Sequence, residues 1–259
     1  MKNKIGWCNT TWNPVWGCNN RDECKKYCYA RIFAKRFWRS KAKSEYKDYI
    51  CEVEEGEDAY DLMRLIRDLG DRLRFFIPTF IHSNFEKPFP KKPQRIFIGS
   101  MSEIAHWEKR WMEDLILDKI KEYPQHTFIF LTKYPSIYRQ YDFPENCWLG
   151  VTITKNPKDG ESGRWDYYEY KQHNKGNLKF VCYEPLLMQM QLIYYLNLEG
   201  IDWVIVGAET GKRKGKVIPK KAWIEDIVDS CRKRGIPIYL KDSLKEIYPE
   251  EIKMFPEEK

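Results

Sequence analysis

Residues 202–209 have the sequence DWVIVGAE, a continuous apolar run that ends in a carboxylate. Runs of this kind are typical of strands buried on both faces, as in a parallel sheet covered by helices. Six further segments are also predicted to be strands, and several of these apolar runs end in polar residues. They are residues 5–12, 95–102, 127–133, 147–153, 178–184 and 236–241.

Helix candidates alternate with these strands, at residues 24–38, 107–123 and 220–234. In the second, an apolar stripe is expected to face the core, and Gly235 is well placed to end the third. Alternating strands and helices predict an α/β protein with mostly parallel strands. The number of units favours a full or partial (β/α) barrel, and an open doubly wound sheet is the alternative. The apolar stripe of the helix candidate at residues 107–123 consists of Trp111, Leu115, Ile116, Ile120 and Tyr123.

The length of 259 residues suits a single domain, which we expect to span residues 1–259. Residues of about 40–92 do not follow the strand–helix alternation. They contain an acidic stretch (52–58), a helix expected over 58–69 and a proline-rich end. We interpret them as an irregular and helical insertion after the first unit.

Composition and charge restrict the class of protein. No run of about 18 apolar residues exists, and the start MKNKIGWCNTTWNP lacks an apolar leader, so no membrane association is expected. A cytoplasmic location is expected, where cysteines stay reduced and often bind metal. The formal charge of +7 permits an anionic partner such as nucleic acid, although a solvated Lys/Glu-rich surface explains it equally well.

Three of the eight cysteines lie in the segment TWNPVWGCNNRDECKKYCYARIFAKRF (11–37), just after the first predicted strand. Cys18, Cys24 and Cys28 have the spacing C-x5-C-x3-C. Structural zinc takes four protein ligands, whereas an iron–sulfur cubane held by three cysteines leaves one iron open to a small molecule. The alternative is a stabilising zinc site whose fourth ligand is Cys8, His82 or His106. Three other cysteines have apolar neighbours and are expected to be core residues: Cys147, Cys182 and Cys231.

Several blocks resemble a phage- and bacteria-associated family of radical-SAM-like, three-cysteine-motif proteins of unknown function. The first block is the cysteine segment itself, with its pattern TWNPVWGC…C…CYAR. Five others follow in the family's order along the chain. They are IHSNFEKPFPKKPQRIFIGSMSEIAH (81–106), FLTKYP (130–135), CWLGVTI (147–153), VCYEPLL (181–187) and WVIVGAETG (203–211).

The resemblance implies a radical SAM enzyme with a barrel of the radical SAM type. In such enzymes three cysteines hold a [4Fe–4S] cluster and S-adenosylmethionine chelates the fourth iron. An electron donor reduces the cluster, and cleavage of the sulfonium yields a radical that acts on a substrate. A nucleic acid or nucleotide is the candidate substrate here. A partner protein that the enzyme needs for activity is a separate expectation. The cysteine spacing is wider than the superfamily's usual C-x3-C-x2-C.

The resemblance also suggests residues that contact S-adenosylmethionine. Ser100, Ser102 and Glu103 lie at the end of the second predicted strand, where radical SAM proteins bind the methionine ammonium. A helix cap is the alternative role for Ser102 and Glu103. Thr152 and Thr154 end the fourth strand candidate, where a ribose hydroxyl could be bound. Gly207 permits close approach of a ligand to the backbone, or simply a tight turn.

Catalytic candidates lie at other strand ends and in the matched blocks. Glu184 and Glu209 end two later strands, and a buried carboxylate there needs a cationic partner such as Lys133 or Lys241. His82 and His106 are candidate substrate contacts, proton donors or metal ligands. Structural roles are the alternative for all four candidates: Glu184, Glu209, His82 and His106. The segment KRFWRSKAK (35–43) interleaves cations with aromatics and could bind a phosphate backbone, with a solvated helix end as the alternative.

Overall fold

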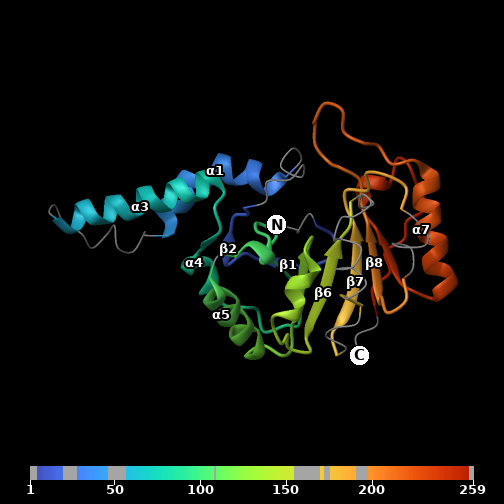
Figure 1. Ribbon diagram of the computed structural model, residues 1–259, viewed down its shortest axis with the longest axis horizontal. Coiled ribbons are helices and arrows are strands. Elements are labelled where there is room, and N and C mark those ends of the chain that lie inside the picture. Colours follow the sequence, from blue (N-terminus) through green and yellow to red (C-terminus); the bar gives the residue numbers. More distant parts are fainter. Residues whose placement is uncertain are drawn as a thin grey trace. The chain divides into compact units, whose positions relative to one another are not determined.

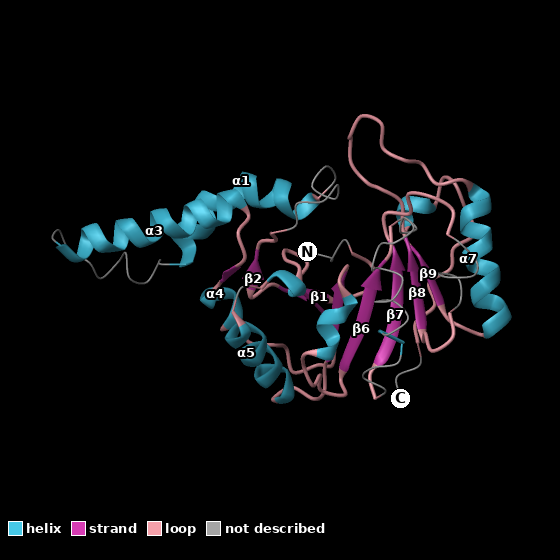
Figure 2. Cartoon of the chain, in the orientation of Figure 1, coloured by secondary structure: helices cyan, strands magenta, loops and turns pink. Residues whose placement is uncertain are grey.

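The computed structural model describes residues 5–19, 28–45, 57–107, 109–154, 170–171, 176–190 and 198–256, with the side chains of 57–60 and 62 left out. The chain divides into two compact units. One consists of residues 10–126, and the other combines residues 1–9 with residues 127–259. Figure 1 shows the chain in sequence colours, and Figure 2 shows its helices and strands.

All seven predicted strands are present and form one sheet in the order β1-β4-β5-β6-β7-β8-β9. β1 pairs with β4 in parallel, and each neighbouring pair from β5 to β9 is also parallel. The α/β class with mostly parallel strands is therefore confirmed, and the strand order is compatible with a partial barrel. The bounds are β1 Thr10–Trp12, β4 Arg95–Ile98, β5 Thr127–Thr132, β6 Cys147–Thr152, β7 Leu178–Tyr183, β8 Trp203–Val206 and β9 Ile238–Leu240.

The central strands are buried along most of their length, as continuous apolar runs predict. All four residues of β8 are inaccessible to solvent. In β6, Gly150 lies opposite Phe180 of β7. A Cβ atom at Gly150 would lie 2.1 Å from the Phe180 ring, so this glycine makes room for the aromatic side chain. Three of the cysteines expected in the core are fully buried: Cys147, Cys182 and Cys231.

In the unit that contains β5–β9, helix α7 (Lys221–Arg234) confirms the helix expected over 220–234. Gly235 ends it in the left-handed conformation, with φ of 64°. This conformation lets the Ile236 amide donate to the Cys231 carbonyl at 3.0 Å, as at many helix C-termini. Two short 3₁₀ helices, η3 (Pro135–Arg139) and η4 (Asp242–Leu244), follow β5 and β9.

The unit of residues 10–126 holds β1 and β4 together with the helical insertion. Helices α1 (Tyr29–Glu45) and α3 (Glu57–Phe75) lie side by side (Figure 1). A small antiparallel sheet, β2 (Val15–Trp16) with β3 (Thr79–Phe80), was not predicted. The short helix α4 (His82–Phe85) comes next along the chain. The helix expected over 58–69 is therefore longer than predicted and corresponds to α3. The helix expected over 24–38 corresponds to α1, which ends at Glu45 and not at residue 38.

Small residues allow α1 and α3 to pack closely. Ala34 and Ala42 of α1 are buried, as are Leu69 and Leu73 of α3. These side chains belong to one hydrophobic cluster. Burial of such leucines contributes about 1.5–3 kcal/mol each, which is the main support for two helices with so many charges.

The apolar stripe predicted over 107–123 is wrong for two of its residues. The segment forms a 3₁₀ helix, η2 (Ile104–His106), and then α5 (Arg110–Lys121). Ile116 and Ile120 are buried as expected, but Trp111 and Leu115 are 44% and 43% exposed. The buried face instead includes Met112 and Leu117.

Candidate functional site

The loop after β4 (Gly99–Glu103) is fixed by a side chain that follows β1. Asn13 Oδ1 accepts hydrogen bonds from Ser100 Oγ and from the Met101 amide, both at 3.0 Å. Since β1 and β4 are parallel neighbours, their carboxyl ends meet at one edge of the sheet. The loop that carries Ser100 and Ser102 therefore lies directly beside the start of the cysteine segment.

The backbone around Cys18 is tied to this loop and to the end of α3. The Gly17 amide donates to the Met101 carbonyl at 3.0 Å, and the Cys18 amide donates to the Phe76 carbonyl at 2.8 Å. Cys18 is therefore held at a defined place between two segments that are distant in sequence. Its sulfur lies 3.2 Å from His106 Nδ1.

Cys28 immediately precedes α1. The Arg31 amide points at its sulfur at 3.5 Å, as N–H groups at a helix start do toward anionic partners. The Arg31 guanidinium donates to the Cys18 carbonyl at 3.2 Å, so one residue contacts both cysteine positions. Cys18 and Cys28 are partly buried and pack against the same hydrophobic cluster, which includes Met101 and Ala30.

These residues fit a metal centre in part. Cys24 falls outside the described residues, and within those that are described no group of three or more His, Cys, Asp or Glu side chains could hold a metal ion. Thiolate and imidazole ligands on one tetrahedral ion are separated by roughly 3.5 Å. The 3.2 Å separation of Cys18 and His106 suits such an edge, and it equally suits an N–H···S hydrogen bond.

The loop residues expected to bind S-adenosylmethionine have structural contacts as well. Ser102 Oγ accepts a hydrogen bond from Trp107 Nε1 at 3.0 Å. Glu103 is buried, and its carboxylate accepts from the Ala105 amide, so it caps η2 as the alternative prediction has it. Ser100 uses its hydroxyl proton toward Asn13, which leaves oxygen lone pairs to accept from an ammonium group.

The two candidate histidines differ in their surroundings. His106 ends η2 beside Cys18 and is half-buried. His82 begins α4, is exposed, and has a T-shaped contact with Phe80, the ring centroids being 5.0 Å apart. Among the candidate fourth ligands of a zinc site, His106 is the residue that lies next to one of the three clustered cysteines, Cys18.

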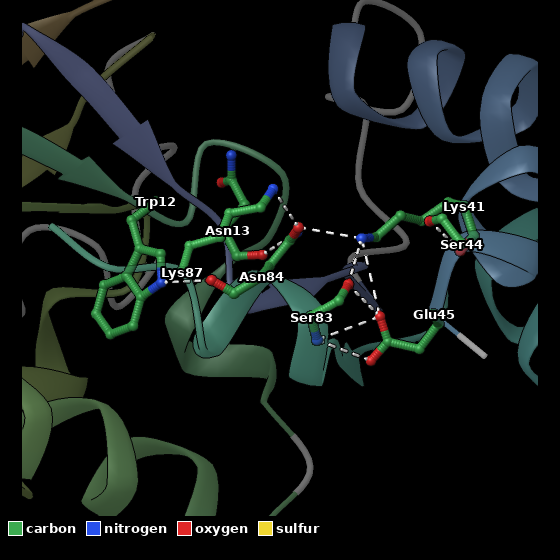
Figure 3. A network of polar contacts seen from close by, with 8 residues as sticks. All are labelled: Trp12, Asn13, Lys41, Ser44, Glu45, Ser83, Asn84 and Lys87. Atoms are coloured by element: carbon green, nitrogen blue, oxygen red, sulfur yellow. Dashed lines mark hydrogen bonds and ion pairs between the residues drawn. The ribbon is translucent and has the colours of Figure 1, made fainter. Parts of the chain in front are cut away.

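A buried polar network that the sequence did not reveal supports Asn13 (Figure 3). Asn84 Nδ2 donates to the Asn13 carbonyl at 2.8 Å, and Trp12 Nε1 donates to the Asn84 carbonyl at 3.0 Å. Asn84 Oδ1 accepts from Lys41 at 3.0 Å and from Lys87 at 3.1 Å. Every polar group of the Asn84 side chain is used, so this residue connects the end of β1 to α1.

The far side of the same network contains an ion pair on α1. Lys41 lies 3.8 Å from Glu45, and both side chains are largely buried. Glu45 in turn accepts hydrogen bonds from the amide and hydroxyl of Ser83. Burial lowers the pKa of Lys41, an effect that Glu45 opposes. The only sequence signal was the Lys–Glu spacing of four residues on a helix, which is common on exposed faces.

Candidates in the other unit pair among themselves. Lys241 Nζ donates to the Glu184 carboxylate, as expected for one of the two predicted cations. A Cβ atom at Gly207 would lie 3.0 Å from Lys241 Cδ and 3.1 Å from the Glu184 side chain. Gly207 therefore leaves space for this ion pair. Thr152 ends β6 and Thr154 follows two residues later, with its carbonyl accepting from the Leu187 amide at 3.1 Å.

Glu209 has a partner that was not foreseen. Arg213 donates two hydrogen bonds to its carboxylate, at 2.6 Å and 2.7 Å. These bonds lower the pKa of Glu209, and burial of the carboxyl group opposes the shift. A carboxyl group with a lowered pKa stabilises the fold above its ordinary pKa of 4.5, and this stability is lost as the pH falls through the pKa in the folded state.

We therefore expect Arg213→Met to reduce the free energy of unfolding by about 2 kcal/mol at pH 7, because it removes two charge-assisted hydrogen bonds from a buried carboxylate that keeps the backbone hydrogen bond of Val217. The loss should shrink at pH 4, below the ordinary pKa of 4.5, because protonation of the carboxyl group removes the charge that Arg213 neutralises. Urea unfolding at both pH values measures this difference. Lys221→Met is the control, since its ion pair with Glu225 is exposed and should contribute under about 0.5 kcal/mol. Equal losses for Arg213→Met at the two pH values would contradict the linkage.

The fold and site define an α/β protein with a parallel sheet and a thiol–imidazole pair beside a serine-containing loop. Residues 2–249 match a family described as "Protein of unknown function (DUF5131)". Since the match covers almost the whole chain, the chain belongs to this family. No curated protein and no solved structure matches it. In the described parts of the chain, no helix has both the length and the apolarity to cross a bilayer.

Proposed function

We propose that the chain is a radical SAM enzyme whose [4Fe–4S] cluster is held by Cys18, Cys24 and Cys28. The observation that carries this proposal is the meeting of two loops at the carboxyl ends of β1 and β4. Parallel α/β sheets bind ligands at this edge. Cys18 and Cys28 pack against one hydrophobic cluster there, and Met101 of the neighbouring loop belongs to it.

The chain's own residues would have distinct roles around this cluster. Ser100, Ser102 and Glu103 would supply oxygen acceptors for the ammonium of S-adenosylmethionine, and Asn13 holds the start of their loop through Ser100 and the Met101 amide. Arg31 fixes the backbone at Cys18. The partly buried packing of the thiols restricts access of water and oxygen.

Further candidates come from the sequence and belong to the other unit. Thr152, Thr154 and Gly207 are candidates for contacts with the ribose and adenine. Glu184 and Glu209 are candidates for proton transfer or substrate binding, each with its cation. When bound and reduced, the cluster would supply the electron that cleaves a carbon–sulfur bond of the sulfonium. A nucleic acid or nucleotide is the proposed substrate class, since the chain carries a formal charge of +7.

The products of S-adenosylmethionine test this proposal. Protein reconstituted without oxygen and reduced with dithionite is expected to release 5′-deoxyadenosine, which chromatography with mass detection identifies. Release of methylthioadenosine would still support a functional cluster, but it would show that a different carbon–sulfur bond is cleaved. Absence of turnover in protein that holds a full cluster and binds S-adenosylmethionine would contradict the enzymatic proposal.

A zinc-stabilised, non-catalytic nucleic-acid-binding protein is the second candidate, and the contact between His106 and Cys18 favours it. In that case His106 would complete a Cys₃His site with the three cysteines. The two candidates give opposite results for His106→Ala. A three-cysteine cluster should retain nearly all of its iron and sulfide, because His106 would only donate a hydrogen bond to a cysteine sulfur.

Elemental analysis of the His106→Ala protein therefore separates the candidates. Under the zinc alternative, the variant should lose at least 90% of its metal and unfold at a lower temperature. His82→Ala is the matched control, because this exposed histidine is not expected to affect metal content under either candidate. Loss of iron in His106→Ala but not in His82→Ala would refute a cluster held by the cysteines alone.

A further inference from the structure

Helices α1 and α3 form a pocket that the proposed cluster site does not use. Its volume is about 390 Å³, enough to hold one planar ring system of the size of a nucleobase. Trp38 of α1 and Met63 and Ile66 of α3 provide its apolar wall. Four cations also line it: Arg39, Lys43, Arg64 and Arg67.

The indole ring of Trp38 is held in place as a flat wall. It lies against Gly70 of α3, since a Cβ atom there would be 2.8 Å from the ring. The guanidinium groups of Arg39 and Arg74 lie 5.1 Å and 5.9 Å from the ring centroid. A fixed aromatic ring with adjacent cations is the arrangement on which unpaired bases stack in proteins that bind single strands.

No described carboxylate lies within ion-pair distance of the cations that line the pocket. Among the described side chains, none of the four lining cations is in an ion pair, whereas Lys41 on another face of α1 pairs with Glu45. Arg39, Lys43, Arg64 and Arg67 are all exposed. They are therefore available to neutralise an anionic partner.

The aromatic surface continues along α1 beyond the pocket. Phe33 and Phe37 are 44% and 37% exposed, and their ring centroids are 4.5 Å apart. The Arg36 guanidinium lies 5.2 Å from the Phe37 centroid. Aromatic rings that alternate with arginines along one helix extend the positively charged surface over several residues, as a polymeric anion requires.

We propose that the pocket between α1 and α3 binds single-stranded nucleic acid, with one base against Trp38 and phosphates on the surrounding cations. A base that is paired and stacked in a duplex cannot enter such a pocket. A membrane surface fits less well, because the apolar side chains here are interleaved with cations instead of forming one apolar face. The proposal does not depend on the cluster, and its test needs neither S-adenosylmethionine nor a reductant.

Fluorescence anisotropy with labelled 12-nucleotide oligo(dT) and oligo(U) tests it on the full chain. The triple variant Arg39→Ala/Arg64→Ala/Arg67→Ala is expected to bind at least tenfold more weakly. Its slope of log K against log salt should fall by about two, since each lost phosphate contact removes about 0.7. Trp38→Ala is expected to bind about tenfold more weakly with an unchanged slope, because it removes stacking alone.

The control is Arg110→Ala/Lys121→Ala/Lys221→Ala, which removes the same charge from exposed positions on α5 and α7. This control variant should bind the oligonucleotides with an affinity within twofold of the wild type and with the same slope of log K against log salt. Thermal unfolding verifies that each variant is folded, and the arginine triple variant decides the result if Trp38→Ala is not. Equal losses in the two triple variants, or a wild type that binds anionic vesicles but no oligonucleotide, would overturn the proposal.

Discussion

Replacing Cys18 or Cys28 by alanine is expected to reduce bound iron and sulfide from about four each per chain to less than about one. Three thiolates hold three of the four irons in the proposed cluster, so the loss of one leaves too few ligands to retain it. Cys24→Ala should have the same effect, although this residue lies outside the described part of the chain. Iron and sulfide assays on anaerobically reconstituted variants provide the measurement.

Cys231→Ala is the matched control for these variants. Its thiol is fully buried in α7, and burial raises its pKa to about 12, so it stays protonated and is no metal ligand. We expect an unchanged cluster content and a loss of about 1 kcal/mol in stability. Full iron content in Cys18→Ala or Cys28→Ala would exclude that cysteine from the ligands.

Gly17→Ala is expected to have the largest effect on stability, a loss of more than about 3 kcal/mol. Gly17 has φ of 115°, where side chains are strained, and a Cβ atom would lie 2.2 Å from the Ile77 carbonyl oxygen. Because that obstacle is backbone, it cannot rotate away. The substitution should separate the cysteine segment from the Ile77–Pro78 backbone and displace Cys18, which is the next residue.

Urea unfolding compares Gly17→Ala with Gly215→Ala. Gly215 also has positive φ, 71°, but a Cβ atom there would meet nothing within 4 Å. Its substitution should therefore cost only about 1–2 kcal/mol for the backbone conformation. Similar losses in the two variants would show that the close approach at Gly17 is not rigid. Lower cluster content in the Gly17 variant alone would further support its role in placing Cys18.

Most of the sheet could be predicted because its strands are continuous apolar runs. β8 and β5 stand out in the sequence for this reason. β2 and β3 do not, because two-residue strands have no periodicity to detect. The error at Trp111 and Leu115 has a similar cause: neighbouring positions on a helix differ by 100°, and these two apolar residues lie along one side of the true buried face of α5.

The cysteines and the loop of Ser100 and Ser102 could be recognised in the sequence because their residue types have particular chemistry. The residues that position them could not. Asn84 contacts Asn13, and Asn13 contacts the loop after β4, across 71–88 positions of the chain. An asparagine in a loop is usually a turn residue, and no local pattern indicates such a partner. Likewise, nothing in the sequence distinguishes Arg213 from an ordinary surface arginine. It becomes the partner of Glu209 only through the fold of its loop.

The metal and sulfide content of wild-type protein purified without oxygen tests the central proposal most directly. A brown protein with about four irons and four sulfides per chain is the predicted result. A colourless protein that holds one zinc ion and takes up no iron or sulfide would contradict it, and would assign His106 beside Cys18 to a structural zinc site instead.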